Sequence, residues 1–340
     1  MCRCRVSLAA GLLVGALLAV GCQSTALTSA KLYLQQDQPE RAKQQLLLAA
    51  QNTPDDPEVH LLLGRVYAME GDWRAMAAAL DRAAAGGPKL AGEIEQIRRY
   101  FWAQQYNAGV AAATAAEPDY ARARDHFAAA TTIDPREVPA WRNLAFAHYM
   151  LGSADSAIVA YERAVEAAPQ DTLALGGLAK LLVQQGRYEA ARGLLQQLVE
   201  LSPDDVGAWV NLGIASAQLD DDQAAEAAFR QALSLAPGRP EAHYGLGNVY
   251  WQRGRYEDAK RAYEKSIEID PADVNARYNL ALAHVQLGDD AGAQPILEKL
   301  SVETPDNCRV WQALSRIYAR QDRLRLATAA EAKAKELGCE

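Results

Sequence analysis

Small and large apolar residues recur along the chain in a fixed order with a period of 34 residues. Six prolines mark this period, and each lies 34 residues from the next: Pro135, Pro169, Pro203, Pro237, Pro271 and Pro305. Pro54 and Pro88 keep the same spacing. Proline ends a helix, and a fixed period of roughly 20 to 50 residues is typical of stacked repeats. The pattern therefore predicts a series of helical hairpins.

The spacing of small residues predicts how the two helices of each hairpin pack. We number each unit so that its closing proline is position 32. Position 20 is alanine in every unit except the one with Met76, and position 8 is always small, as at Gly213. Large residues such as Trp209 and Phe229 fill the facing slots, as close helix packing requires. Glycine recurs where the first helix should stop, at Gly71, Gly152, Gly186, Gly254 and Gly288.

These recurring positions resemble the tetratricopeptide repeat family over residues 23–340. The resemblance implies an all-α fold, a right-handed α-solenoid of about nine helical hairpins. The units are expected at 23–56, 57–90, 91–137, 138–171, 172–205, 206–239, 240–273, 274–307 and 308–340.

The third unit, 91–137, is irregular, because it carries an insertion of about 13 residues. Its segment "GEIEQIRRYFW" is expected either to extend the first helix of the unit or to form an additional short helix. The remaining residues, 138–340, form a regular array in which the last unit acts as a cap.

The charge of the chain narrows the class of partner. The net charge is −8, and an acidic protein repels a phosphate backbone, so nucleic acid is not expected as the main partner. The only uninterrupted apolar run lies at the N-terminus. Nothing after that run is expected to span a membrane.

The N-terminal segment has the order of features of an export signal. Two arginines precede the uncharged run from Val6 to Val20, which is too short as a helix to cross a bilayer. The following "LLAVGC" resembles the lipobox of bacterial lipoproteins, which implies removal of residues 1–21 and acylation of Cys22. In that family Gln23 after the cysteine favours an outer-membrane protein that faces the periplasm. An uncleaved anchor and an ordinary cleaved signal are the alternatives.

Candidate catalytic residues are sparse. The five histidines are His60, His126, His148, His243 and His284, and four of them fall at positions 4 and 11, which are aromatic packing slots in the family. No metalloprotease, nucleophile-elbow or phosphate-loop motif is present. The aspartates of "PDD" and "LDDDQ" lie in turns, where aspartate caps helices. We therefore expect no catalytic residue, no metal site and no cofactor.

The resemblance places a concave groove along the first helices of the repeats. Amides and aromatics dominate its expected lining, and charge is scarce. The candidate groove residues are Tyr106, Asn107, Arg142, Asn143, Phe146, Tyr149, Asn211, Tyr244, Asn248, Trp251, Tyr278 and Asn279. Asparagine can donate to and accept from a peptide backbone, and aromatic side chains offer flat apolar area. The alternative is that these residues only make the contacts between repeats that are common in the family.

Two cysteines lie at the ends of the last unit. Cys308 is position 1 and Cys339 is position 32, and these positions lie at the same end of an antiparallel hairpin. An export signal would place them in a compartment that permits disulfides. A bond between Cys308 and Cys339 is therefore possible.

These observations predict a non-enzymatic scaffold that binds other proteins, as an extended peptide or a helix held in the groove. The resemblance to bacterial lipoproteins implies a lipid anchor on Cys22 and a role in assembling an envelope complex of the pilus, secretion or export type. The alternative is an adaptor or regulator of peptidoglycan or other periplasmic enzymes. No small-molecule substrate is implied.

Overall fold

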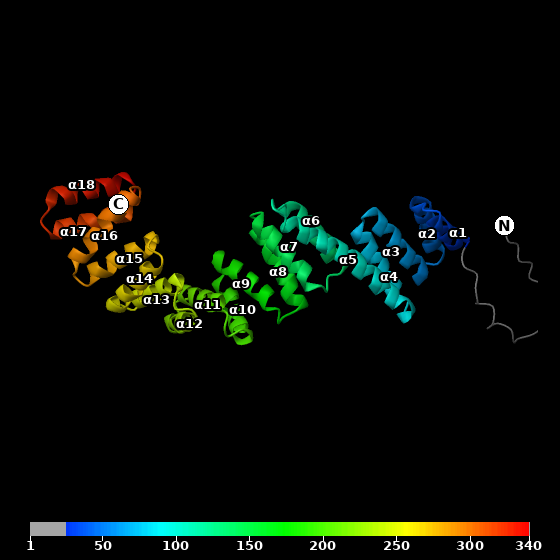
Figure 1. The fold of residues 1–340 in the computed structure, drawn as a ribbon, viewed down its shortest axis with the longest axis horizontal. Coiled ribbons are helices and arrows are strands. Elements are labelled where there is room, and N and C mark those ends of the chain that lie inside the picture. Colours follow the sequence, from blue (N-terminus) through cyan, green and yellow to red (C-terminus); the bar gives the residue numbers. More distant parts are fainter. Residues whose placement is uncertain (1–24, 340) are drawn as a thin grey trace, which may run out of the picture. The chain divides into compact units, whose positions relative to one another are not determined.

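The computed structural model describes residues 25–339, and within them it holds 18 α-helices and one 3-10 helix (Figure 1). The predicted all-α fold of consecutive helical hairpins is confirmed. The chain divides into two compact units, with the division between Ala160 and Tyr161. Residues 1–24, which include Cys22, lie outside the described residues.

The first unit is built from consecutive helix pairs. Its elements are α1 (Thr25–Gln35), α2 (Pro39–Asn52), α3 (Pro57–Glu70), α4 (Trp73–Ala85), η1 (Pro88–Leu90), α5 (Ala91–Ala113), α6 (Tyr120–Ile133) and α7 (Val138–Met150). Helix α8 (Ala154–Ala167) contains the division between the two units.

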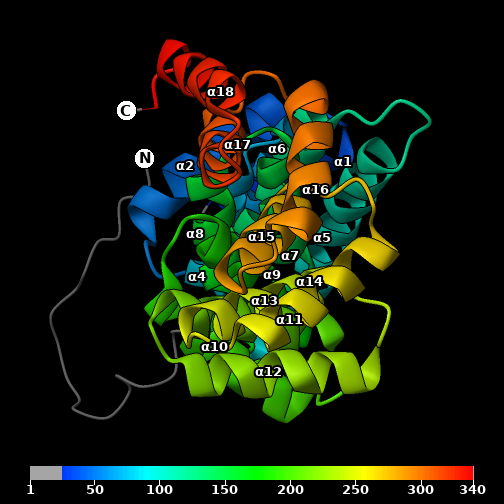
Figure 2. The ribbon, with the colours of Figure 1, turned by 90° about the vertical axis from the view of Figure 1, so that its left-hand side faces the viewer.

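The second unit continues the same order of helices. Its elements are α9 (Thr172–Gln184), α10 (Tyr188–Leu201), α11 (Val206–Gln218), α12 (Asp222–Leu235), α13 (Pro240–Gln252), α14 (Tyr256–Ile269), α15 (Val274–Gln286), α16 (Asp290–Glu303), α17 (Cys308–Arg320) and α18 (Leu324–Glu336). Figure 2 shows α12 below α11 and α13, and α12 packs against both of these helices.

Aspartate begins many of these helices, as the sequence predicts. The side chain of Asp205 accepts a hydrogen bond from the backbone N–H of Ala208, and Asp221 accepts one from Ala224. Such caps satisfy backbone donors that the first helical turn leaves unpaired. The aspartate N-caps are Asp56, Asp72, Asp119, Asp171, Asp205, Asp221, Asp273 and Asp289.

Left-handed residues end the first helices of the repeats. The predicted glycines occupy this conformation, with φ between 69° at Gly254 and 78° at Gly288. Glycine favours this region because it has no Cβ. Asp37, Asp220 and Asp322 have φ of 55°, 57° and 58°, and each also lies just after a first helix.

Aromatic side chains on the second helices fill space left by small residues on the first helices. Phe229 of α12 is 1% exposed. A Cβ built on Gly213 would lie 2.7 Å from the Phe229 ring, and one built on Gly245 would lie 2.3 Å from it. Tyr263 of α14 approaches Gly247 in the same way, at 2.4 Å. The small residues at position 8 therefore set how closely the two helices approach.

Position 4 ties five of the repeats to the proline turn before them. The indole N–H groups of Trp141, Trp209 and Trp311 donate to the carbonyl oxygens of the prolines six residues earlier, at 2.8–2.9 Å. His60 and His243 make the equivalent contact through Nε2, at 2.6 and 2.9 Å. These two histidines therefore replace tryptophan as packing and hydrogen-bonding residues.

The insertion in the third repeat extends one helix. Residues of "GEIEQIRRYFW" form the first half of α5, which is 23 residues long, so the first of the two sequence alternatives is correct. Arg98 in this extension is 8% exposed, and it donates to the carbonyl oxygen of Ile133 at 3.1 Å and to Asp81 at 2.5 Å. The extension is thereby held against α4 and α6.

A nearly buried carboxylate links two repeats of the second unit. Glu226 of α12 is 7% exposed, and its oxygens lie 2.7 Å from Arg230, 2.5 Å from Arg253 and 3.3 Å from Arg255. A buried carboxylate needs such paired charges to offset its lost hydration. The two later arginines belong to the turn before α14, so this cluster connects consecutive hairpins.

A disulfide closes the last hairpin in the structure. Cys308 at the start of α17 is joined to Cys339 after α18, and their Cα atoms lie 5.7 Å apart. Ala327, Ala330 and Ala334 of α18 are buried against α17, and the bond fixes both helices at one end.

We predict opposite effects for two glycine-to-alanine changes in helix interiors. Gly213→Ala should lower the free energy of unfolding by about 1–3 kcal/mol, because the new methyl group would clash with Phe229. Gly193→Ala in α10 should raise it by about 0.5–1 kcal/mol, because nothing lies within 4 Å of the added Cβ. Urea unfolding followed by circular dichroism measures both. Equal effects for the two variants would contradict this packing account.

Candidate functional site

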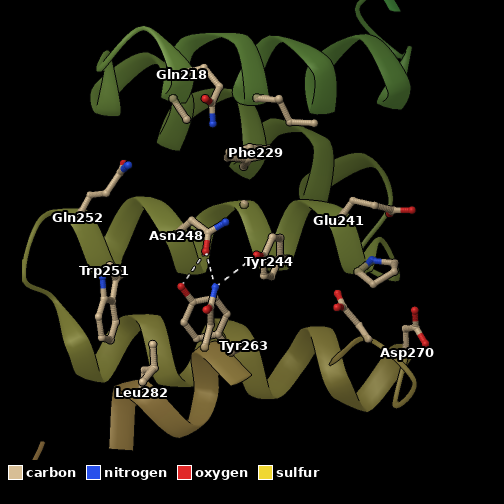
Figure 3. Close-up of a pocket in the computed structure, with 16 residues that line it drawn as sticks. Gln218, Phe229, Glu241, Tyr244, Asn248, Trp251, Gln252, Tyr263, Asp270 and Leu282 are labelled. Carbon is tan, nitrogen blue, oxygen red and sulfur yellow. Dashed lines mark hydrogen bonds between the residues drawn. The ribbon is translucent and has the colours of Figure 1, made fainter. Parts of the chain in front are cut away.

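A cavity of about 550 Å³ opens between the first helices of three consecutive repeats, α11, α13 and α15 (Figure 3). Its aromatic lining comes from Phe229, Tyr244, Trp251 and Tyr263. Ligand sites in proteins are usually concave and mainly apolar, with a few polar groups that fix orientation. This cavity has that character.

A hydrogen-bonded network forms the middle of the cavity wall. The amide nitrogen of Asn279 donates to the Tyr244 hydroxyl at 3.3 Å and to Oδ1 of Asn248 at 3.1 Å. The Tyr263 hydroxyl donates to the same Oδ1 at 2.8 Å. Burial raises the pKa of Tyr263, so its hydroxyl keeps the proton that it donates.

Two hydrogen-bond donors of this network have no acceptor within residues 25–339. The first is the amide nitrogen of Asn248, whose oxygen already accepts two bonds. The second is the hydroxyl of Tyr244, which accepts from Asn279 and still carries its own hydrogen. Both residues line the cavity. A ligand with two acceptors, such as backbone carbonyl groups, fits these donors.

The two ends of the cavity differ in chemistry. Figure 3 shows Trp251 and Leu282 at one end, and Glu241 and Asp270 at the other. The Trp251 ring is held at its edge by Tyr256, with ring centroids 5.2 Å apart. The cavity therefore has an apolar end and an acidic end on either side of the amide network.

Four of the twelve predicted groove residues line this cavity: Tyr244, Asn248, Trp251 and Asn279. Asn211 and Tyr278 belong to α11 and α15 but lie outside its lining, and burial raises the pKa of Tyr278. The other six belong to α5 and α7 of the first unit: Tyr106, Asn107, Arg142, Asn143, Phe146 and Tyr149. Their part in peptide binding stays a prediction.

Two of the asparagines at position 6 make contacts between repeats. Asn143 donates to the Tyr106 hydroxyl of the preceding repeat at 3.1 Å, and Asn279 makes the equivalent bond to Tyr244. Asn143 and Asn279 therefore make the contacts between repeats that were the alternative to peptide binding. Asn211 has no hydrogen-bond partner among the described residues.

The remaining histidines take part in local structure. His126 contacts the Gln105 side chain at 2.8 Å. Burial lowers the pKa of His148, and the charge of Arg124 adds to that effect. His284 contacts Asp289 at 2.7 Å, but Asp289 is the N-cap of α16 and neither residue lines the cavity.

The described residues contain no group of three or more histidine, cysteine or acidic side chains placed to hold a metal ion. None of the helices within residues 25–339 is both long and apolar enough to cross a membrane.

Sequence reasoning missed the acidic end of the cavity. The groove was expected to be poor in charge, yet Glu241, Asp270 and Asp273 all line this hollow. Glu241 lies on α13, which is one of the first helices that the groove was expected to follow. Asp270 and Asp273 belong to the turn between α14 and α15, and no repeat pattern indicated that this turn reaches the cavity.

Family models match most of the described chain. The model of the cilia and flagella-associated protein 70 C-terminal domain matches residues 138–340, which is more than half of the chain. The chain belongs to this family, which is built from tetratricopeptide repeats. A general tetratricopeptide repeat model matches residues 27–91. Such families usually lack catalytic activity and bind proteins or peptides. No curated protein is significantly similar to the chain.

Many solved structures share the fold of this tetratricopeptide protein. A tetratricopeptide repeat protein from Parabacteroides merdae has a TM-score of 0.52 at 21% identity, with 72% of this chain and 94% of that chain covered. Pseudomonas aeruginosa pilF has a TM-score of 0.52 at 19% identity, with 61% and 94% covered. MamA has 28% identity and a TM-score of 0.46, with 51% and 94% covered. The first two likenesses support the fold.

We predict that Asn279 stabilises the array and that Asn211 does not. Asn279→Ala should lower the free energy of unfolding by about 1–3 kcal/mol, because it removes two hydrogen bonds between repeats. Asn211→Ala should change it by less than about 0.5 kcal/mol, since its amide has no partner in the described chain. Urea unfolding of both variants measures the difference. Equal loss in the two variants would contradict the architectural role of Asn279.

Proposed function

We propose that this protein is a scaffold that binds a segment of another protein in the cavity between α11, α13 and α15. The observation that carries the proposal is the pair of unused donors on Asn248 and Tyr244 inside an aromatic hollow. Carbonyl groups of a peptide backbone pair with such donors whatever the peptide sequence. Trp251 and Leu282 then take up an apolar side chain.

Several features of the site support binding rather than catalysis. The family usually lacks catalytic activity. The pair of His284 and Asp289 lies outside the cavity and serves a helix N-terminus. The hydroxyl of Tyr263 is used within the network and stays protonated. The site therefore offers recognition groups and no positioned acid–base pair.

We predict that Trp251→Ala weakens peptide binding at least about tenfold, because truncation of a tryptophan that anchors a ligand commonly costs about 2 kcal/mol or more. The probe is a random library of 12-residue peptides displayed on phage and selected on the purified protein. Fluorescence anisotropy with the synthetic form of the most enriched peptide then measures the dissociation constant.

The matched control is Leu235→Ala, which truncates a 40% exposed apolar side chain outside the cavity. It should leave the dissociation constant unchanged, and thermal melting establishes that both variants are folded. Equal affinity of Trp251→Ala and the parent protein would place the peptide elsewhere and would refute the proposed site.

We further propose that the scaffold acts at a bacterial envelope, anchored through lipid on Cys22 and facing the periplasm from the outer membrane. The sequence "LLAVGC" after a short apolar run supports this setting, as does the possibility of oxidised cysteines there. There it would help to assemble a complex of the pilus, secretion or export type. The match to a family named after a cilia and flagella-associated protein favours a second setting, in a cilium or flagellum.

The two settings differ in what happens at Cys22. In the bacterial envelope, Cys22→Ser should move the protein from the membrane fraction to the soluble or unprocessed fraction, because acyl chains provide the anchoring. Membrane fractionation and intact-mass measurement test this, with Cys4→Ser as the control in the same segment. Unchanged partitioning and unchanged mass of Cys22→Ser would remove the lipid-anchored setting.

A further inference from the structure

We propose that the segment bound in this cavity carries a lysine or arginine, and that the acidic end of the cavity binds this side chain. The inference rests on the proposed function, because it names the chemistry of the segment that the same cavity holds. Three carboxylates line the cavity, those of Glu241, Asp270 and Asp273, and Figure 3 shows the first two at one end. Among the described residues that line the cavity, none is a lysine or arginine.

The three carboxylates keep oxygens that no other group uses. Asp270 accepts the backbone N–H of Ala272 through Oδ1 at 3.0 Å, and Asp273 caps α15 through its own Oδ1. The Oδ2 atoms of both aspartates have no partner within the described chain. Glu241 is exposed, and neither of its oxygens has a partner there. These oxygens are available to donors from a ligand.

Helix geometry makes the position of Glu241 suitable for this role. Glu241 is the second residue of α13, and the backbone N–H groups of a helix start favour negative charge. The negative charge of Glu241 is therefore favourably placed without a partner among the described residues. An ammonium or guanidinium group of a ligand gains an attraction there and loses little hydration, since the carboxylate is exposed.

The cationic arginines of the neighbouring repeat lie outside this cavity. Arg309 and Arg316 belong to α17, and neither lines the cavity. The net charge of the whole chain, −8, also attracts a basic segment from solution. The carboxylates of the cavity and the net charge of the chain therefore both favour a positively charged ligand.

The geometry also orders the ligand along the cavity. The acidic residues and the Trp251–Leu282 pair lie at opposite ends, with the donors of Asn248 and Tyr244 between them (Figure 3). A bound segment would place its basic residue at the Glu241 end and an apolar residue at the Trp251 end. Its backbone carbonyl groups would meet the two donors in between.

The test uses the purified protein and the phage-displayed random 12-residue library described above. Peptides enriched on the parent protein should carry lysine or arginine a few residues from an apolar residue. The double variant Glu241→Gln, Asp270→Asn should weaken the most enriched peptide about three- to tenfold, because two exposed charge pairs are lost. Changing the basic residue of that peptide to methionine should produce a similar loss on the parent protein and little loss on the double variant.

A matched control removes the same charge elsewhere. Glu257 is the second residue of α14, exposed and outside the cavity, and Asp204 is an exposed turn aspartate. The variant Glu257→Gln, Asp204→Asn has the same net charge as the test variant and should bind like the parent protein. Thermal melting of both double variants establishes that they are folded.

The outcomes separate this inference from the proposed function. If no enriched peptide loses affinity on Trp251→Ala, the proposed site fails and the inference fails with it. If Trp251→Ala weakens binding but the enriched peptides lack basic residues, the cavity binds peptides and the inference is wrong. It is also wrong if the acidic double variant and its control bind equally.

Discussion

The rest of this structure depends on one kind of contact. An aromatic side chain on a second helix packs against a glycine on a first helix. Phe229 occupies the space that a Cβ on Gly213 or Gly245 would need, and Tyr263 occupies the corresponding space over Gly247. Close-packed interiors tolerate few changes in volume, so this fit sets the spacing of the helices. The same two rings then become part of the cavity lining.

The network beside these rings serves architecture and recognition together. Asn279 joins α15 to Tyr244 and Asn248 of α13, so it holds two repeats at a fixed separation. Asn279 uses the oxygens of Tyr244 and Asn248 as acceptors, so these oxygens are engaged within the protein. What remains is a pair of donors on Asn248 and Tyr244, held in place by bonds within the protein. A preorganised donor of this kind costs less to bind than a flexible one.

Two of the three carboxylates of the cavity come from a turn, and the third, Glu241, comes from the first turn of α13. Asp270 and Asp273 lie in the turn that links α14 to α15, and one oxygen of each is used to order that turn or to begin the next helix. The other oxygen of each has no partner in the described chain, and both residues line the cavity. Asp273 caps the start of α15, which explains its presence locally. The same residue also adds negative charge to the cavity.

The sequence by itself determined the repeat, the order of the helices and their ends, because each of these depends on local rules. Prolines, capping aspartates and left-handed glycines act within a few residues of the chain, and they recur every 34 residues. The fold class and the packing roles of His60 and His243 follow from that register. Four of the predicted groove residues line the cavity, and all four belong to first helices of the repeats. Only the tertiary structure decided which amides are used between repeats, that the insertion extends α5, and that a turn brings carboxylates to the cavity. Those outcomes depend on distances between side chains of different repeats, which no single period of the sequence contains.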